Sequence, residues 1–553
     1  MLFEYKYKGF SGVTSTPKRT AMSFVPDAAR SPTWFRGTVH QELPFREAIS
    51  ALHDVVVSDL RFKPKDREAY KRWAAEQEEI WLAEYMARAA DNKERIEALK
   101  RELSEVHRQK QEVMAPFYKA QQQYFDYLWK HNRDWWFVLD PVITVHPDEI
   151  FYECFSEDES TYARLSCGHE VFTQSDEFAC GTTNIDYSAD LYDEFQKIRS
   201  YKETELTVDP DGFSVQTGED EGHREVKIDL PDSWVRGFLQ VSSAMNLPGF
   251  EIDLHPMDLH NICFKLRQRR EKEGPRSLRF LLEPGEPVAI IFDPWGTRLE
   301  CPRSTYHGTS SEEIRIWGRR RLHVLERLIP VAKNVRVKLL GYGMPSFWVV
   351  DLGDMQFTLG LSGWTANDWS KSGNFDLLAP RADVTPDVSK TVLEALNDCW
   401  VASSDELAGR LEIPHADVLG ALSASTQAGL AIYDLSKEVW RARALSREPL
   451  PLDSLRFQNE REEQAMKLVA SADVTIQPAT NARLLEGRVQ GHTVHVVVDL
   501  DERMVEADCE CNFHQQNKLR KGPCEHILAT RMKAKRMKAQ RMKAQRMNTT
   551  GQL

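Results

Sequence analysis

Near the end of the chain stand Ala507-Asp-Cys509-Glu-Cys511 and, after twelve intervening residues, Cys524-Glu-His526. Three cysteines and one histidine are thus grouped in two pairs, Cys-x-Cys and Cys-x-His. Structural zinc sites are filled by four thiolate and imidazole ligands in a tetrahedral arrangement. The spacing therefore predicts that Cys509, Cys511, Cys524 and His526 bind one zinc ion. Because four protein ligands leave no open position, we expect this zinc to be structural and assign it no reaction.

Two strands joined by a tight turn are predicted before the first pair, at residues 483–489, Gln490-Gly491 and 493–499. A helix is predicted to begin at the second pair. This order, together with the ligand spacing, resembles the SWIM zinc finger. The resemblance implies a small ββα domain over residues 480–531 that binds nucleic acid or protein. His514, in the intervening loop, is a less suitable alternative ligand because it lies off the paired spacing.

The composition is that of a globular protein with several domains. Of 553 residues, 41% are hydrophobic and 28% charged, and a chain of this length usually forms about two to four domains. We find no apolar run near the length of a membrane-spanning helix and no signal peptide at the first residues. Nine cysteines without a secretion signal indicate reduced thiols and metal ligands. We therefore expect a cytoplasmic protein.

Charge is distributed unevenly along the chain. The net charge is −12, but eight cations and no acid follow residue 530, so the first 530 residues carry −20. An acidic body argues against non-specific nucleic-acid binding by the whole molecule. The basic repeat tail, residues 532–553, is predicted to be solvated and partly helical, and it could bind nucleic acid by counterion release. Candidate partner contacts in the finger loop and tail are Lys518, Arg520, Lys521, Arg531 and Lys533.

The N-terminal part is predicted to contain a loop-rich lead and then a long helix. The lead covers residues 1–65, with one helix around Phe45–Val56. Over residues 66–132 we expect a long helix or helical hairpin that Pro116 ends or kinks. Apolar residues between Leu82 and Val113 follow a heptad pattern. This pattern fits a dimerising coiled coil, but we favour a long helical hairpin that packs on its own body.

Residues 135–380 predict a central α+β domain whose topology the sequence does not decide. Strands are expected at residues 288–292, 314–317, 334–340, 347–351 and 355–359, and a helix at 319–332. Three stretches of this region are similar to bacterial SWIM-finger proteins of undetermined activity, namely His255–His260, Gly318–Leu325 and Leu361–Trp369. The similarity implies no mechanism.

Residues 386–445 predict a winged helix-like domain, and residues 447–475 a linker helix. Three helices are followed by two strands joined by a tight turn. In DNA-reading winged helices the third helix enters the major groove. Here the third helix, Ala416–Gln427, has no lysine or arginine, so we favour a structural or protein-docking role. Arg441 and Arg443 in the second strand are the exception.

Three further groups of residues suggest chemistry only weakly. Cys154, Cys167, His169 and Cys180 could form a second metal site, but their spacing fits no known pattern. His255, Asp258 and His260 could form a metal or acid–base set, although Pro256 is expected to disfavour a helix there. Arg319, Arg320 and Arg321 are expected to pair with Glu312, Glu313 and Glu326. No motif for a nucleophile or a phosphate-binding loop is found.

The sequence thus predicts an α+β multidomain protein with a long N-terminal helix, a mixed central body, a winged helix-like domain and a C-terminal SWIM zinc finger. We expect an interaction protein with one structural zinc and a protein partner. One alternative is a DNA- or RNA-binding protein that uses the finger loop and tail. A second is an enzyme of unknown reaction in the central domain. A homodimer could form through the heptad at residues 82–113.

Overall fold

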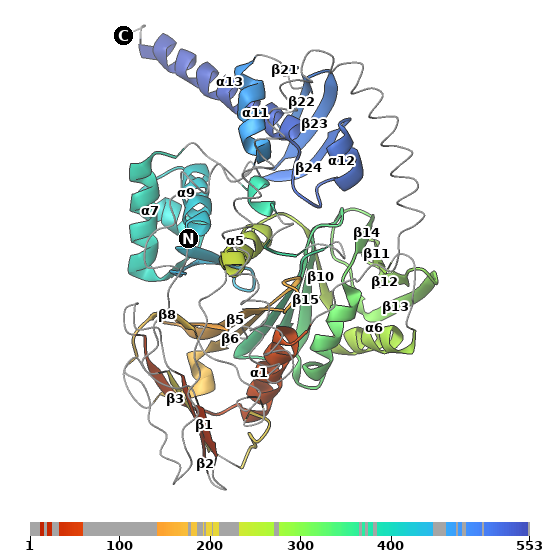
Figure 1. Ribbon diagram of the computed structural model, residues 1–553, viewed down its shortest axis with the longest axis vertical. Helices are drawn as coiled ribbons and strands as arrows, with labels where there is room; N and C mark the ends of the chain where they lie inside the picture. Colours follow the sequence, from red (N-terminus) through yellow and green to blue (C-terminus); the bar gives the residue numbers. More distant parts are fainter. Residues whose placement is uncertain are drawn as a thin grey trace, which may run out of the picture. The chain divides into compact units, whose positions relative to one another are not determined.

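The computed structural model describes residues 12–15, 19–24, 33–58, 141–174, 178–184, 192, 195–201, 203–208, 232–269, 276–363, 368–370, 374–379, 384–445, 460–471, 474–477, 483–499 and 503–550. The chain divides into two compact units, of which one is Arg61–Val138 and the other contains the remaining residues. The predicted long helix over 66–132, its heptad and the proposed dimer therefore lie outside the described residues. Figure 1 shows the larger unit, which contains all the described elements.

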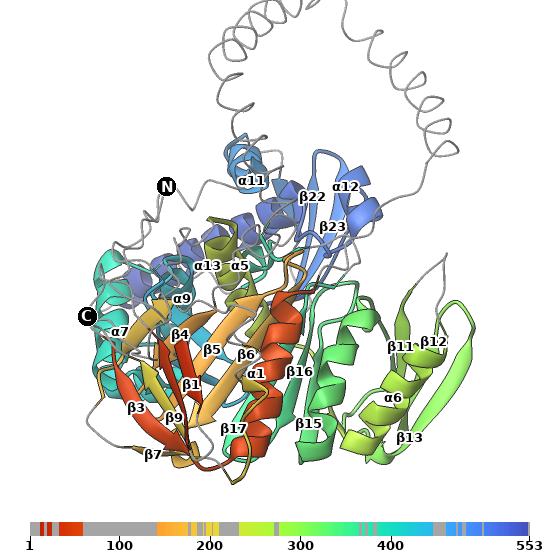
Figure 2. The same ribbon diagram turned by 60° about the horizontal axis from the view of Figure 1, so that its bottom comes forward.

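An eight-stranded antiparallel sheet forms the centre of the larger unit. Its strand order is β10-β15-β16-β17-β6-β5-β4-β8. The strand β17 pairs with β6, so that Phe357 lies opposite Leu165 and residues far apart in the chain share one sheet. Figure 2 shows β5, β6, β17, β16 and β15 side by side. The strand bounds are β4 Val142–Val145, β5 Glu149–Phe155, β6 Thr161–Gly168, β8 Gly181–Asn184, β10 Phe250–Leu254, β15 Asn334–Leu339, β16 Ser346–Asp351 and β17 Met355–Leu361.

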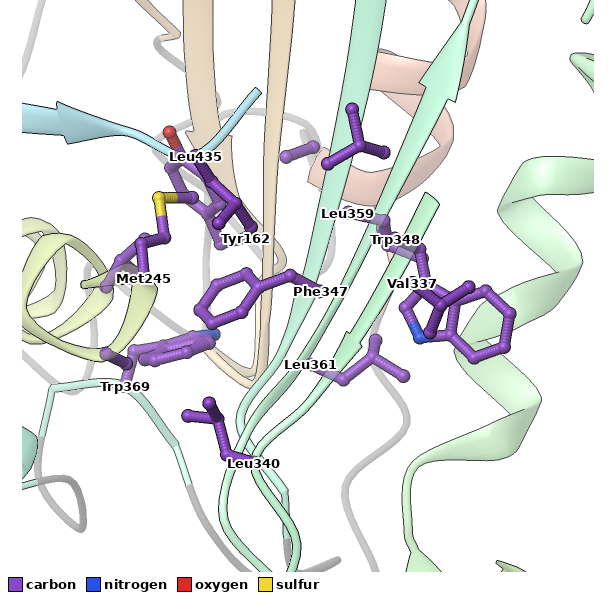
Figure 3. Packing of buried hydrophobic residues seen from close by; sticks show 14 of the residues in the cluster. Tyr162, Met245, Val337, Leu340, Phe347, Trp348, Leu359, Leu361, Trp369 and Leu435 are labelled. Carbon is purple, nitrogen blue, oxygen red and sulfur yellow. The ribbon is translucent and has the colours of Figure 1, made fainter. Parts of the chain in front are cut away.

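The strand β16 contributes to the hydrophobic core on both faces of this sheet. Because side chains alternate along a strand, Phe347 and Trp348 point to opposite faces (Figure 3). Phe347 packs beside Trp369, with 5.9 Å between ring centroids, and Trp348 packs beside Phe280, at 6.2 Å. All four aromatic residues are fully buried. Both faces of the sheet are thus covered, which explains why β16 is almost continuously apolar.

Two smaller sheets accompany the central one. The four-stranded sheet has the order β13-β12-β11-β14, and the five-stranded sheet has the order β1-β2-β9-β3-β7. Predicted strands at residues 288–292 and 314–317 are present here as β12 and β14. The bounds are β1 Gly12–Ser15, β2 Arg19–Phe24, β3 Phe35–Val39, β7 Phe172–Gln174, β9 Glu203–Val208, β11 Leu278–Leu282, β12 Pro287–Phe292, β13 Thr297–Thr305 and β14 Glu312–Ile316.

The N-terminal lead is more ordered than its sequence indicates. It contributes β1, β2 and β3 to the five-stranded sheet, and α1 (Glu42–Val56) packs against β5 and β6. The expectation of a loop-rich segment is therefore wrong for the three strands, whereas α1 confirms the helix expected around Phe45–Val56. The partners β7 and β9 lie far away in the chain, and this non-local pairing leaves little trace in the local sequence.

One prediction about local helix structure is confirmed in part, and another is wrong. The helix predicted at residues 319–332 is present as two 3₁₀ helices, η3 (Arg319–Arg327) and η4 (Ile329–Val331). Pro256 does not prevent a helix: it is the first residue of α6 (Pro256–Gln268), where a missing N–H costs no hydrogen bond. His255 caps this helix, because its Nδ1 accepts a hydrogen bond from Met257 N at 3.1 Å. Other helices of the body, among the residues that the structure describes, are α5 Asp232–Met245, η2 His169–Val171 and η5 Phe375–Leu377.

Residues 386–442 contain three helices and a small antiparallel sheet of order β18-β20-β19. Ser403 and Glu406 form a reciprocal capping box at the start of α8, as their spacing predicts. Gly429, at φ 71°, follows α9 and allows the chain to turn into β19. The element bounds are α7 Pro386–Cys399, β18 Val401–Ala402, α8 Ser404–Leu411, α9 His415–Gln427, β19 Ala431–Asp434 and β20 Val439–Ala442.

The C-terminal elements form a four-stranded antiparallel sheet of order β21-β22-β23-β24 with helices packed on it. The predicted ββα order is thus extended by β21, β24 and a short helix, α12. The basic tail continues the finger helix, since α13 runs without interruption from Glu525 to Thr550. The bounds are α11 Glu460–Ala470, β21 Val474–Ile476, β22 Leu484–Val489, β23 His492–Val498, β24 Met504–Cys509, α12 Asn512–Asn517 and α13 Glu525–Thr550.

Among the residues that the structure describes, none of the helices is both long enough and apolar enough to cross a membrane.

Candidate metal centre

Four potential zinc ligands converge where β24, α12 and α13 meet. One donor atom from each of Cys509, Cys511, Cys524 and His526 lies within 4.8 Å of the others, and all four residues are buried. Cys509 ends β24, Cys511 precedes α12, and the second pair lies at the start of α13. The fold thus brings together the two pairs that the sequence separates by twelve residues.

Backbone amides around the first pair are directed at its sulfur atoms. Cys511 has extended backbone angles, φ −68° and ψ 151°, and its Sγ accepts a hydrogen bond from His514 N at 3.4 Å. Cys509 Sγ accepts from Cys511 N at 3.5 Å. Hydrogen bonds of this kind favour the charged thiolate over the thiol. The turn between β24 and α12 therefore directs backbone N–H groups at both sulfurs, although burial raises the pKa of Cys511.

His526 has one ring nitrogen available for a metal. Its Nε2 lies 3.4 Å from Gln490 Oε1, whereas its buried Nδ1 makes no hydrogen bond of normal geometry in the described structure. The ring also packs edge-on against His492, with 4.8 Å between centroids. Metal-bound histidines commonly donate their other N–H to an oxygen acceptor. The residues present therefore fit a zinc ion bound through Nδ1, with Gln490 orienting the ring.

Contacts among Cys509, Cys524 and His526 shift the pKa values of all three side chains. Hydrogen bonding from Cys524 lowers the pKa of Cys509 to about 4, and the same contact raises the pKa of Cys524. The nearby Cys509 sulfur raises the pKa of His526. Zinc binds only deprotonated thiols and neutral imidazole, so zinc would replace these protons and release them. With four protein ligands, the ion would stabilise the fold and leave no vacancy for substrate.

Four buried donors on a short strand, a turn and a helix start define a zinc finger with one structural zinc. The type of finger follows from the sequence around them: the profile of the SWIM zinc finger family matches residues 494–530. The chain therefore carries a SWIM zinc finger in which Cys509, Cys511, Cys524 and His526 are the metal ligands.

Other comparisons add little about the rest of the chain. A search among functionally curated proteins finds no match. Proliferating cellular nuclear antigen from Entamoeba histolytica is 12% identical, covering 40% of this chain and 89% of that chain, with a TM-score of 0.28. The PCNA2–PCNA3 complex from Sulfolobus tokodaii is 9% identical, covering 41% of this chain and 90% of that chain, with a TM-score of 0.29. Scores this low support no inference about the fold or the function of this chain.

Most of the candidate contact cations make contacts within the protein. Lys518 Nζ lies 3.2 Å from Asp508 Oδ1. Arg520 donates through Nε to the Asn517 carbonyl at 2.9 Å and through Nη2 to the Gln516 carbonyl. Arg531 donates to the carbonyls of Leu377 and Ala379, at 3.1 and 2.9 Å. Lys521 and Lys533 are the remaining two, and Lys521 is exposed.

The finger is joined to the body by backbone contacts around η5. Met504 N donates to the Leu378 carbonyl at 3.1 Å, beside the two acceptors of Arg531. The finger loop approaches closely at Gly522, where a Cβ atom would stand 2.8 Å from the Asn374 carbonyl oxygen. Gly522 also has φ 80°, which favours glycine. Through these contacts the finger packs against η5.

The other candidate metal ligands do not form a metal site. Among the described residues, only the SWIM cluster brings three or more potential ligands together, so the set Cys154, Cys167, His169 and Cys180 is not one. Cys154 lies opposite Ala163, and Cys167 lies opposite Ile150, four residues away along β5. His514 is also outside the ligand group; it is fully buried, with Nε2 3.2 Å from Asp508 Oδ1.

Asp258 is likewise engaged structurally. Its Oδ2 accepts hydrogen bonds from Arg303 N at 3.0 Å and Ser304 Oγ at 2.7 Å, which joins α6 to β13.

The sequence predicts that Arg319, Arg320 and Arg321 pair with nearby glutamates. This prediction is wrong for Arg319 and Arg321. Arg319 donates to the carbonyls of Ser277 and Asp293, and Arg321 pairs with Asp158 at 3.3 Å. Each of these side chains serves the fold.

Arg441 and Arg443 are not available as phosphate contacts. Arg441 is fully buried and pairs with Asp434 and Asp148, both at 2.7 Å. Arg443 is 2% exposed and pairs with buried Glu153. The sequence suggests Arg441 and Arg443 as exceptional cations of the wing, and this suggestion is therefore wrong. Arg441 of β20 and Arg443 just after it instead pair with carboxylates of β5 and its preceding turn.

Sequence reasoning identified the ligands but missed the residues that position them. Gln490 stands in the predicted turn and orients His526, a role that the turn prediction alone does not show. Arg461 of α11 donates to the carbonyls of Lys521 and Pro523, both at 2.9 Å, just before Cys524. Its guanidinium also lies over the Phe513 ring, at 4.7 Å. Only the spatial proximity of α11 to the ligand loop reveals this contact.

Proposed function

We propose that this chain is an interaction protein whose zinc-stabilised finger holds α13 on the body and presents its basic continuation to an acidic surface of a protein partner. The supporting observation is that α13 begins within the ligand set and runs to Thr550 as one helix. Zinc binding and the start of the basic segment thus share one element. Zinc would act by ordering this element and would take no part in a reaction.

The cations of the finger bind groups of the same chain, and this favours a protein partner over nucleic acid at the finger itself. Lys518, Arg520 and Arg531 bind an aspartate or carbonyl oxygens of the same chain. A phosphate-binding surface needs cations that face solvent.

The segment 386–445 also favours a protein partner over nucleic acid. We propose that it is a winged helix-like unit with a structural role, since α9 lacks lysine and arginine and Arg441 and Arg443 are buried.

A capture experiment on nuclease-treated cell extract tests the proposal. One variant replaces the tail cations Lys533, Lys535, Arg536, Lys538, Arg541, Lys543 and Arg546 with glutamine, which retains helix propensity and leaves Arg531 in place. We expect a protein that wild type enriches to be lost with this variant and with Cys509→Ser. Enrichment that depends on intact nucleic acid, or that survives both changes, would contradict the proposal.

Nucleic-acid binding by α13 is a second candidate, supported by its run of cations. Seven cations and no acid follow Arg531 on this helix. Binding of a labelled duplex should then weaken steeply with salt, with a log–log slope of about −0.9 for each phosphate contacted. The seven-glutamine variant should abolish that binding. A shallow slope, or binding that the variant retains, would exclude α13 as the contact.

Two further expectations remain proposals. We propose a reducing compartment, the cytoplasm, because all nine cysteines are free thiols in this structure. We also propose that a homodimer, if formed, uses the heptad at residues 82–113, outside the described residues. Sedimentation of a variant with Leu99→Asp and Leu103→Asp would test the dimer.

A further inference from the structure

The outer face of α6 carries apolar side chains where a surface helix normally carries polar ones. Its inner face is buried through Leu259, Ile262, Cys263 and Leu266. Met257 and Phe264 lie on the opposite face, and each is 45% exposed. They are seven residues apart, which is two helical turns, or about 10 Å. Helix α6 is therefore apolar on two opposite sides, and packing against the body explains only one of them.

Aromatic stacking extends this outer apolar face. The His260 ring stacks on the Phe264 ring one turn later, with 6.4 Å between centroids and 18° between planes. Asn261 lies between Met257 and Phe264 on the same side of the helix by the 100° step. Helix α6 lies beside β13 at one edge of the body, as Figures 1 and 2 both show. The face Met257–His260–Phe264 forms a strip that an elongated partner can cover.

Cations border the strip on both sides, although the first 530 residues carry −20. On one side lie Lys265 of α6 and Arg303 of β13. The Arg303 side chain is 54% exposed, and its Nη1 lies 3.8 Å from buried Asp258. On the other lies Arg267, which is 52% exposed and 3.0 Å from Glu326. On β13, Arg298 and Glu300 pair at 3.3 Å, so their charges offset each other. The three cations Lys265, Arg267 and Arg303 stand against the two acids Asp258 and Glu326, so the border of the strip has an excess of one positive charge.

We propose that the outer face of α6 is a docking site for an acidic amphipathic helix of a partner protein. Apolar side chains of that helix cover Met257 and Phe264, and its flanking carboxylates face Lys265, Arg267 and Arg303. Paired hydrophobic anchors with a complementary charged rim are the usual arrangement for helix recognition. This surface is independent of the zinc finger, so it goes beyond the function proposed above.

A pair of designed peptides tests this assignment on the full chain. The first is a fluorescent amphipathic helix of about 18 residues, long enough to form in the bound state, with leucine on one face and glutamate on its flanks. The second has lysine in place of every glutamate. We expect wild type to bind the glutamate peptide and not the lysine peptide. No binding of the glutamate peptide, or equal binding of both, would overturn the proposal.

Variants locate the binding. Met257→Ser and Phe264→Ser should each weaken the glutamate peptide about tenfold, the effect of losing one partly buried apolar anchor, and Lys265→Glu should weaken it as well. Met466→Ser is the matched control, because Met466 is 39% exposed on the distant helix α11. Equal affinity of all variants would overturn the assignment. Self-association that Phe264→Ser abolishes would assign the strip to a second copy and also overturn it.

Discussion

Arg531 Nη1 donates a hydrogen bond to the Leu377 carbonyl oxygen across 3.1 Å, and this contact joins α13, the helix that starts just after Cys524 and carries His526, to the body. The second guanidinium nitrogen, Nη2, donates to Ala379 in the same way. One side chain thus links the zinc-bound end of α13 to η5. The order of the metal site and the position of the finger are therefore coupled.

Replacing Arg531 with methionine should loosen this junction. Two carbonyl groups would lose a charged donor, at a cost of about 1–3 kcal/mol each when no water replaces it. We expect faster amide exchange in residues 374–379 and 503–509, measured by mass spectrometry. Lys533→Met removes the same charge two residues later and should change the exchange little. Equal effects of the two substitutions would show that the contact does not hold the finger.

Zinc content should depend on the predicted ligands and on no other cysteine. Elemental analysis should find about one zinc per wild-type chain, the number that a closed four-ligand site holds, and none in Cys509→Ser. Cys399→Ser, on α7 and away from the site, should retain zinc. Affinity should also fall as the pH is lowered, because zinc competes with protons for the thiolates. A zinc-bound Cys509→Ser variant would move the site elsewhere.

Gln490→Met should weaken zinc binding without removing a ligand. The change retains side-chain length but removes the amide oxygen near His526 Nε2, and such supporting contacts typically contribute roughly 10- to 100-fold in affinity. Competition with a chromophoric chelator measures the effect. Arg488→Met is the control, because Arg488 is exposed on β22, the strand that precedes Gln490. Unchanged zinc affinity in Gln490→Met would mean that α13 alone orients His526.

Arg441→Met should destabilise the protein strongly. Asp434 and Glu149 are both buried, and they would lose a buried partner. Breaking a buried ion pair on one side typically costs about 3–5 kcal/mol. Arg410→Met, which breaks an exposed pair with Asp398 at 4.0 Å, should cost less than about 1 kcal/mol. Urea denaturation of both variants distinguishes these outcomes.

Stability should fall in mild acid because of His146. Burial lowers the pKa of His146 from 6.5 to about 3, while Nε2 lies 2.7 Å from the Ala442 carbonyl oxygen. Between these two values the unfolded chain binds a proton that the folded protein does not, so the free energy of unfolding decreases as the pH falls. The full contribution is present above pH 6.5.

The slope is roughly 1.4 kcal/mol per pH unit, so wild type should lose about 2 kcal/mol between about pH 6.5 and 5. His146→Gln can still donate to Ala442 but does not titrate, and it should lose less over the same range. Urea midpoints at the two pH values give the comparison. Parallel losses in wild type and variant would assign the acid sensitivity to other groups.

The metal ligands were predictable because zinc imposes its requirements on a short stretch of chain. Residue type and spacing at Cys509–His526 are enough, and the fold then confirms that the donors meet. Strands such as β15 and β16 were predictable for a similar reason, since their apolar pattern and the Gly353 turn between β16 and β17 are local signals.

What could not be predicted depends on distant partners. The lead forms strands because β9 and β7 are there to pair with it, more than 130 residues later in the chain. Arg441 and Arg443 resemble solvent-facing cations of a wing until Asp148 and Glu153 are seen beside them. The apolar side chains of α6 are visible in the sequence, but which of them face solvent is not.

The buried charges between β6 and the hairpin of β19 and β20 also have a consequence for biosynthesis. Arg164 and Asp434 are 270 residues apart in the chain. At about 5–20 residues per second, a ribosome needs roughly a quarter-minute to a minute to pass from one to the other. Until then Glu149, Glu153 and Arg164 lack the partners that the later segment supplies. The central sheet is therefore expected to complete its folding only after residue 443 has left the ribosome, which makes the nascent chain a candidate for chaperone protection.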